Sequence, residues 1–271
     1  MADEVEARPD EGAAGHGNSE PATQVDGGDD GDDRDPAWRS GRGLGLALIA
    51  SLALWQLPFG GFLLYPFKLL ATWMHELSHG LVMLATGAGF DRMEIFRDGS
   101  GLAHQASKVG PARGALIAAA GYMGTPVFGA AMMIAAPRAR IARRAVFGMG
   151  AALALSAALV VSNPFGQVAV ALSATALIAA GLLLPARWAV GAAYLLAAQA
   201  CVNAVLDIRV LFRPTLLVNG EVAGASDASN MALATFGTDA PWAVRFWATA
   251  WLAWSLAITW VALRMLRRAE T

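Results

Sequence analysis

Long runs of apolar residues recur along most of the chain and are separated by short polar connections. After Arg42 these runs reach about 20 residues, the length that a helix needs to cross the hydrocarbon core of a bilayer. The pattern predicts seven such segments, at residues 43–64, 66–86, 114–136, 145–162, 166–185, 187–206 and 242–264. The first two are joined through a break rich in proline and glycine at 56–61, where one segment can re-enter the bilayer instead of crossing it. We therefore expect an all-α polytopic membrane protein with six or seven membrane helices.

Two polar connections between these segments have patterns of their own. Residues 91–107 contain two short alternating stretches on either side of Asp98-Gly99, a dipeptide typical of tight hairpin turns. Residues 207–241 carry few large apolar side chains and are expected to form one long loop. The expected fold is thus a helical membrane bundle with a small β-hairpin after the second apolar segment.

The first 36 residues differ sharply from the rest of the chain. They contain 12 of its 21 acidic residues, only two basic residues and almost no large apolar side chains. Such a segment cannot bury enough apolar surface to offset its conformational entropy, so we expect a disordered acidic tail over residues 1–36. Residues 37–271 are expected to form one membrane-embedded domain.

Composition narrows the class of protein further. The chain is 56% hydrophobic and 15% charged, whereas soluble domains average about 45–50% apolar and about 25% charged residues. Residues 37–271 carry 18 basic and 9 acidic side chains. Arginines gather before the first segment, around residue 140 and near the C-terminus, and an even number of crossings would place all three groups on the cytoplasmic side. These features exclude a soluble globular enzyme and a nucleic-acid-binding domain, and the single cysteine, Cys201, excludes a disulfide scaffold.

The strongest chemical signal is the pentapeptide His75-Glu76-Leu77-Ser78-His79, an H-E-x-x-H motif within an apolar segment. On a helix, residues four apart lie on one face, so both imidazoles can bind one metal ion. Glu76 lies beside them and can act as general base toward a water molecule at a zinc ion. The alternative is a polar helix face whose side chains are satisfied by neighbouring helices. Ionisable groups inside a bilayer are costly and usually functional, which favours the metal site.

A catalytic zinc ion with two histidine ligands needs a third protein ligand. Asp207 is the first candidate because it ends an apolar helix, and Asn203, one turn earlier, can orient it or bind a substrate carbonyl. His104, on the expected hairpin, is the rival ligand. Asp207 can instead form an ion pair with Arg209 or Arg213. We expect Asp207 rather than His104 to bind the metal, because a helix end is a more rigid support than a short hairpin.

Asp227 is a further acidic residue in the expected long loop. It lies in Ser226-Asp227-Ala228 at the start of a helical stretch, so we interpret it as a helix cap. This interpretation leaves it outside the expected metal site.

Three features together resemble the site-2 protease type of intramembrane zinc metallopeptidase, and most closely its compact bacterial members. They are HELSHG in an apolar helix, a hairpin with the turn R-D-G-S-G, and N-x-x-x-D-I-R at a late helix end. The resemblance covers residues 43–264 and implies a multi-pass integral protein of the bacterial plasma membrane. It also implies that His75, His79 and Asp207 bind Zn²⁺, that Glu76 is the base, and that the substrate is a transmembrane protein or peptide.

The sequence therefore predicts a zinc metalloprotease that hydrolyses peptide bonds within or beside the membrane. Its partners would be the lipid bilayer and a transmembrane substrate, with no nucleic acid. An unwound substrate is expected to pair with an edge of the 91–107 hairpin, because strand addition presents an extended backbone to the site. The alternative function is that of a non-catalytic membrane scaffold or transport-related protein that retains a metal site.

Overall fold

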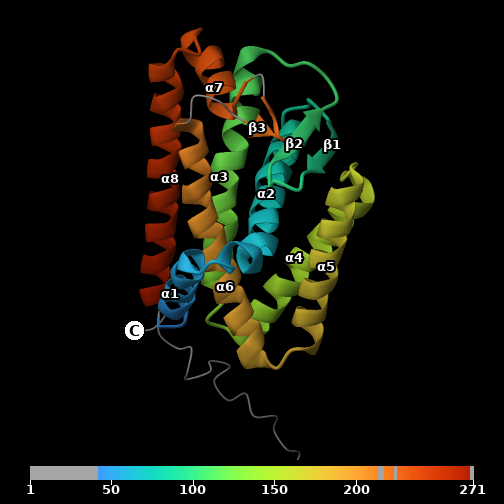
Figure 1. Cartoon of the computed structure of the whole chain (residues 1–271), viewed down its shortest axis with the longest axis vertical. Helices are drawn as coiled ribbons and strands as arrows, with labels where there is room; N and C mark the ends of the chain where they lie inside the picture. The colour runs from blue at the N-terminus through green and yellow to red at the C-terminus, as the bar shows by residue number, and fades with distance from the viewer. Residues whose placement is uncertain (1–41, 213–216, 223–224, 269–271) are drawn as a thin grey trace, which may run out of the picture. The chain divides into compact units, whose positions relative to one another are not determined.

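The computed structural model describes residues 42–212, 217–222 and 225–268, and this part of the chain is mainly helical (Figure 1). Its elements are α1 (Arg42–Gln56), α2 (Gly60–Ala85), β1 (Phe90–Ile95), β2 (Gly101–Gln105), α3 (Pro111–Ala135), α4 (Ala139–Leu159), α5 (Pro164–Leu183), α6 (Ala186–Ile208), the 3-10 turn η2 (Arg209–Phe212), β3 (Leu217–Val218), β4 (Glu221–Val222), α7 (Asp227–Phe236) and α8 (Pro241–Arg268). The predicted class, a helical polytopic membrane protein with a small hairpin after the motif helix, is confirmed. The tail predicted for residues 1–36 lies outside the described residues.

Five of the described helical segments are long and apolar enough to cross a membrane. They are α3, α4, α5, α8 and α6 together with η2. The predicted six or seven membrane helices also included the segments at 43–64 and 66–86, and neither α1 nor α2 is among these five. With 15 residues, α1 is shorter than a bilayer-spanning helix.

The break between α1 and α2 lies within the predicted stretch 56–61, so the second helix begins earlier than the expected segment at 66–86. Pro58 lies in the turn between them, as expected, but Pro66 lies inside α2 and does not end a helix. A proline inside a helix removes one backbone hydrogen bond, here the bond to the Phe62 carbonyl near the start of α2. Helix α2 nevertheless continues through Pro66 over all of its 26 residues and carries the H-E-x-x-H motif.

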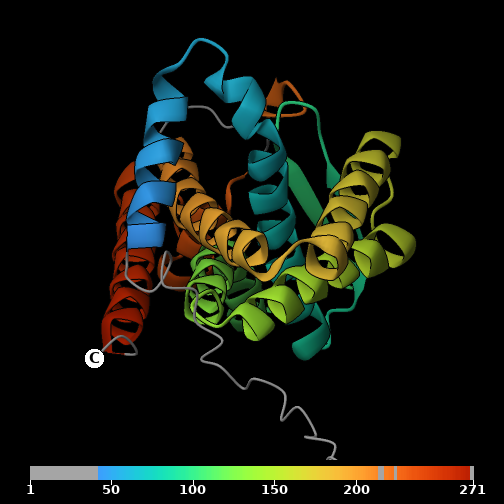
Figure 2. The ribbon, with the colours of Figure 1, turned by 90° about the horizontal axis from the view of Figure 1, so that it is seen from below.

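Helix α3 lies at the centre of the helical arrangement and packs against α2, α6, α7 and α8 (Figure 1). Helices α4 and α5 form a closely packed pair beside α6, and α1 lies against α6 and α2 (Figure 2). The core includes Trp73 of α2 and Tyr194 of α6, both 0% exposed. Because α3 touches both α2 and α7, residues from distant parts of the chain meet across it.

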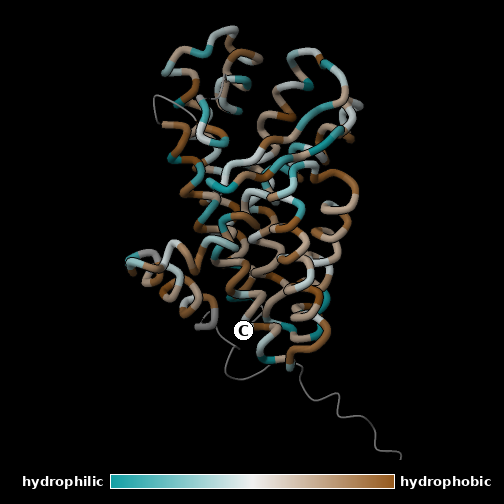
Figure 3. The backbone as a smooth tube through the Cα atoms, turned by 45° about the vertical axis from the view of Figure 1, so that its right-hand side comes forward, coloured by the Kyte–Doolittle hydropathy of each residue, from teal (hydrophilic) through white to brown (hydrophobic). Residues whose placement is uncertain are grey.

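The expected hairpin at 91–107 is present as the antiparallel pair β1–β2, and Gly99 in its turn has φ +81°. Three side chains of α2 hold this turn by donating hydrogen bonds to its carbonyl oxygens. They are Tyr65 to Arg97, Lys68 to Asp98, and Thr72 to Gly99. Polar residues gather along the hairpins, whereas the long helices are mostly apolar (Figure 3). The hairpin is therefore fixed beside the motif helix.

The segment at 207–241 is not the single long loop that was expected. It contains the end of α6, η2, the short hairpin β3–β4 and the ten-residue helix α7. Asn219 and Gly220, with φ +53° and +77°, form the two-residue turn of the second hairpin. The face of α7 that packs against the protein is formed by alanines such as Ala228 and Ala232, so the apolar pattern of this helix is weak.

Candidate metal and active site

Helix α2 presents the two motif histidines side by side, as the spacing of four residues predicts. Their Nε2 atoms lie 3.1 Å apart. Glu76, on the adjoining part of the helix, is 6% exposed and accepts a hydrogen bond from the backbone of Ala103 in β2. The motif helix and the first hairpin therefore form two sides of one site.

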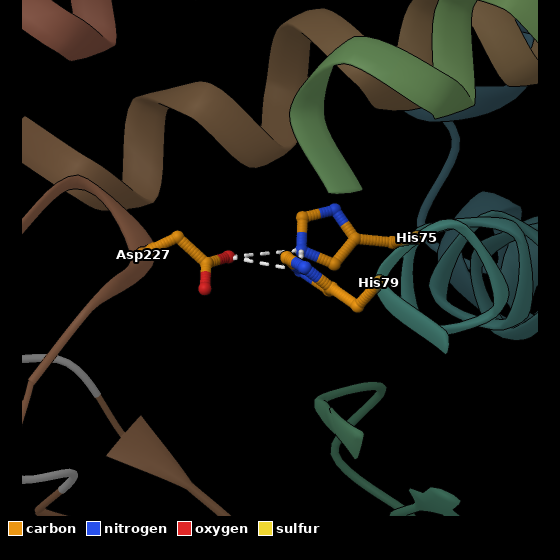
Figure 4. Close-up of side chains that lie close together, drawn as sticks. All are labelled: His75, His79 and Asp227. Atoms are coloured by element: carbon orange, nitrogen blue, oxygen red, sulfur yellow. Dashed lines mark hydrogen bonds and ion pairs between the residues drawn. The ribbon is translucent and has the colours of Figure 1, made fainter. Parts of the chain in front are cut away.

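The third member of this site is Asp227, at the first position of α7 (Figure 4). One carboxylate oxygen, Oδ2, lies 3.2 Å from Nε2 of His75 and 3.2 Å from Nε2 of His79. The interpretation of Asp227 as a helix cap is wrong, because Ser226 is the N-cap and its hydroxyl accepts a hydrogen bond from the Ser229 amide at 3.0 Å. The carboxylate of Asp227 is thus directed at the histidines.

Other contacts of the two imidazole rings orient their Nε2 atoms toward Asp227. Nδ1 of His79 donates a hydrogen bond to the carbonyl oxygen of Ile117 in α3 at 2.6 Å, which leaves Nε2 free as an electron-pair donor. The ring of His75 contacts the edge of Tyr122, with centroids 4.6 Å apart, and Tyr122 in turn stacks on Trp251 of α8. Helices α3 and α8 therefore support the two imidazoles from behind.

The three donor atoms fit a zinc ion. They form a nearly equilateral triangle with sides of 3.1, 3.2 and 3.2 Å. In a tetrahedral zinc site with bonds of about 2.0–2.1 Å, neighbouring ligand atoms lie about 3.3–3.4 Å apart. Two imidazoles and one carboxylate are also a donor set that zinc accepts, with a fourth position left for water or substrate.

The charge on Asp227 suits this role. Burial alone raises the pKa of its carboxyl, but the neighbouring imidazoles of His79 and His75 lower it by more, so that the pKa of Asp227 lies well below its ordinary value. An ionised carboxylate is the form that binds a metal ion.

The residues that the sequence proposed as third ligand lie elsewhere. Asp207, at the end of α6, lines the same cavity but is outside the group formed by His75, His79 and Asp227. Its carboxylate has no hydrogen bond or ion pair with the residues that the structure describes, which include Arg209; Arg213 lies outside them. The geometry thus supports Asp227 instead of Asp207 as the third ligand.

His104 and Asn203 are also outside this group. Nε2 of His104 lies 3.0 Å from Oε2 of Glu94 on the neighbouring strand, an ordinary cross-strand contact. Asn203 is 2% exposed within α6. Neither side chain lines the cavity in front of the histidines, so this geometry supports neither the rival ligand role of His104 nor a contact of Asn203 with a substrate carbonyl.

The histidines, Glu76 and Asp227 open into a cavity of about 1190 Å³. Both hairpins line it, and they are joined by the β1–β2 turn: Asp98 accepts hydrogen bonds from Ser100 and from the Gly220 amide, while Ser100 accepts one from the Asn219 amide. Burial raises the pKa of Asp98, but these hydrogen bonds, together with Lys68, lower it below its ordinary value. A chamber of this size accommodates several residues of an extended peptide.

A comparison with known protein families gives a match. A family model described as Peptidase M50B-like matches residues 44–262. The chain belongs to this peptidase family. It is the site-2 protease family that the sequence resembles, and that resemblance is confirmed together with the assignment to membrane metalloproteases. No curated protein and no solved structure matches the chain.

Among the described residues, the two edges of the first hairpin differ in their contacts. The outer edge of β1 is occupied by the connection between α4 and α5: the Met93 amide donates to Val160, and the Ser162 amide donates to Met93. Asn163 extends this pairing by bonding to both backbone groups of Ile95. The opposite edge of the hairpin, β2, faces the cavity.

Glycine at position 121 makes room for the two motif histidines. A Cβ atom built on Gly121 would lie 2.4 Å from Nε2 of both His75 and His79, far inside van der Waals contact. No sequence pattern links this residue to the motif, because the contact arises only from the packing of α3 against α2.

We expect Gly121→Ala to disturb the site strongly, because both imidazoles must move away from the added methyl group. Overpacking of this kind costs about 1–3 kcal/mol, so the detergent-solubilised variant should unfold at a lower temperature and bind metal more weakly. Gly114→Ala is the matched control on the same helix, where an added Cβ meets nothing within 4 Å. A Gly121→Ala variant as stable and as metal-rich as the Gly114→Ala control would contradict the observed approach.

Proposed function

We propose that this chain is an intramembrane zinc peptidase that hydrolyses peptide bonds within or beside the membrane. His75, His79 and Asp227 would hold the zinc ion, and Glu76 would act as general base. The observation that carries the proposal is the triangle of three ligand atoms, with Glu76 on the same helix and all four residues at one cavity. The resemblance to compact bacterial site-2 proteases supports a place in the bacterial plasma membrane.

Each residue of the site has a defined task in this proposal. Bound zinc would supply Lewis acidity toward a water molecule and the scissile carbonyl. The carboxylate of Glu76 takes the proton from the attacking water and then delivers it to the leaving nitrogen. The backbone of Ala103 orients this carboxylate, and the Ile117 carbonyl keeps Nε2 of His79 directed at the metal position.

The edge of β2 that lines the cavity is the proposed place for the substrate backbone. A transmembrane helix has no free backbone groups to offer a peptidase, so a substrate must unwind before hydrolysis. An unwound segment can form hydrogen bonds along the edge of β2, which lies beside Glu76 and where the Ala103 backbone already donates to that carboxylate. Because the edge of β1 is already occupied, this proposal is limited to β2.

Metal analysis of the purified protein tests the ligand proposal. We expect about one zinc ion per chain in the wild type and nearly none in His79→Ala, since zinc needs its protein ligands to remain bound during purification. His104→Ala serves as the matched control, because this histidine contacts Glu94 and not the site. Zinc-free wild-type protein after purification without chelators would favour the alternative of a non-catalytic membrane scaffold.

A further inference from the structure

Asp207 lines the cavity, and its carboxylate has no hydrogen-bond or ion-pair partner among the described residues. It lies at the end of α6, half-buried, in the wall that also contains His75 and Tyr122. It is close enough to His75 and Lys68 to interact with them electrostatically, yet it forms neither a hydrogen bond nor an ion pair with any residue in the described part of the chain. Its position is therefore compatible with contact to a molecule inside the cavity.

The other carboxylates that line the cavity are either engaged or solvated. Asp227 contacts the two histidines, and Asp98 accepts hydrogen bonds from the two hairpin turns. Glu76 accepts one from Ala103. Glu221 is exposed to solvent. Among the carboxylates that line the cavity, only that of Asp207 is partly buried and has no hydrogen-bond donor among the described residues.

The surroundings of Asp207 indicate what such a donor would be. Lys68, also in the cavity wall, donates to the carbonyl oxygen of Asp98 and so is held at the first hairpin. Val210 and Leu211 line the cavity on the turn that follows Asp207. A carboxylate beside apolar side chains suits a lysine or arginine, whose aliphatic stem packs on the apolar surface while its charged end reaches the carboxylate.

We propose that Asp207 is a specificity-determining residue that binds a basic side chain of the substrate, next to the bond that is hydrolysed. This inference rests on the proposed peptidase function. The electrostatic interaction between Asp207 and His75 places the basic residue close to the metal site. Since lysine and arginine gather at the cytoplasmic ends of transmembrane helices, the favoured substrate is a transmembrane segment near such an end.

The test uses two peptide hydroxamates that differ in a single side chain, lysine or norleucine, next to the metal-chelating group. Their binding to the zinc-loaded full chain is measured by calorimetry for the wild type, for Asp207→Asn and for the control Glu221→Gln. We expect the wild type and Glu221→Gln to bind the lysine compound about ten- to a hundredfold more tightly than the norleucine compound. This is the difference in affinity to which a charge-assisted hydrogen bond in a partly buried site corresponds. Asp207→Asn should bind both compounds equally and retain zinc as firmly as the wild type in a chelator titration.

Four outcomes would overturn the inference. A wild type with no preference for lysine, or an Asp207→Asn variant that keeps the preference, removes the specificity role. Loss of zinc from Asp207→Asn would instead make Asp207 a metal ligand. If neither hydroxamate binds the zinc-loaded wild type, the proposed peptidase function fails and the inference fails with it, whereas equal binding of both leaves the peptidase function intact.

Discussion

The Glu76→Gln variant is expected to keep its metal and to lose peptide hydrolysis by about two to four orders of magnitude. Glutamine has nearly the same shape as glutamate, and it can still accept the hydrogen bond from Ala103. It cannot take a proton from water, so the chemical step fails while the three proposed ligands remain in place. The measurement compares cleavage rates of one reconstituted transmembrane peptide, together with zinc content, for the variant and the wild type.

A matched change separates chemistry from folding in this experiment. Glu94→Gln alters another glutamate, which lies on the first hairpin and contacts His104 rather than the histidines of the motif. We expect this control to cleave at nearly the wild-type rate. Undiminished turnover in Glu76→Gln would show that this residue is not the base.

Replacement of Asp227 by alanine should release the metal. The variant loses one of three proposed ligands, and we expect zinc affinity to fall by more than about a hundredfold, since even groups that only support a ligand are worth 10–100-fold. Helix α7 should persist, because Ser226 and not Asp227 caps it. A competition titration against a chelator in one detergent measures the affinities of Asp227→Ala, Asp207→Ala and His104→Ala.

The three variants give a clear ranking under this account. Asp207→Ala and His104→Ala should stay within a few-fold of the wild type, because neither side chain belongs to the group formed by the histidines and Asp227. If Asp207→Ala lost its zinc while Asp227→Ala kept it, the ligand set expected from the sequence would be right and the one supported by the geometry wrong. Circular dichroism of each variant establishes that its helices are intact.

The helical class and the first hairpin could be predicted because their signals are local. Apolar runs of about 20 residues mark long helices, and Asp98-Gly99 between alternating stretches marks a tight turn. A helical stretch after Asp227 was expected, but residues 207–241 as a whole were expected to form a loop, because alanine forms the buried face of α7 and its pattern resembles that of a polar loop. Pro66 misplaced one boundary, since a proline in the early part of a helix costs a hydrogen bond without ending the helix.

One part of the candidate site could likewise be predicted from the sequence, and another part could not. The relation between His75, Glu76 and His79 follows from helix geometry alone, so it could be read from five residues. The third position depends on which of several distant aspartates the fold brings to that helix. Asp227 is 152 residues from His75 and reaches it only because α7 packs on α3, a contact that no local pattern encodes. Asp207 fitted the sequence better because it ends a strongly apolar helix.

The most direct test of the central claim is zinc-dependent hydrolysis by the purified protein in H₂¹⁸O. The wild type is reconstituted with transmembrane peptides that carry a lysine near one end, depleted of zinc with a chelator, and then resupplied with one equivalent of zinc. The account predicts peptide products whose new carboxyl termini contain ¹⁸O. These products should form before zinc is removed, should not form after its removal, and should form again when zinc is resupplied. Products that persist at an unchanged rate without zinc, or the absence of any ¹⁸O-labelled product from the zinc-loaded protein, would contradict it.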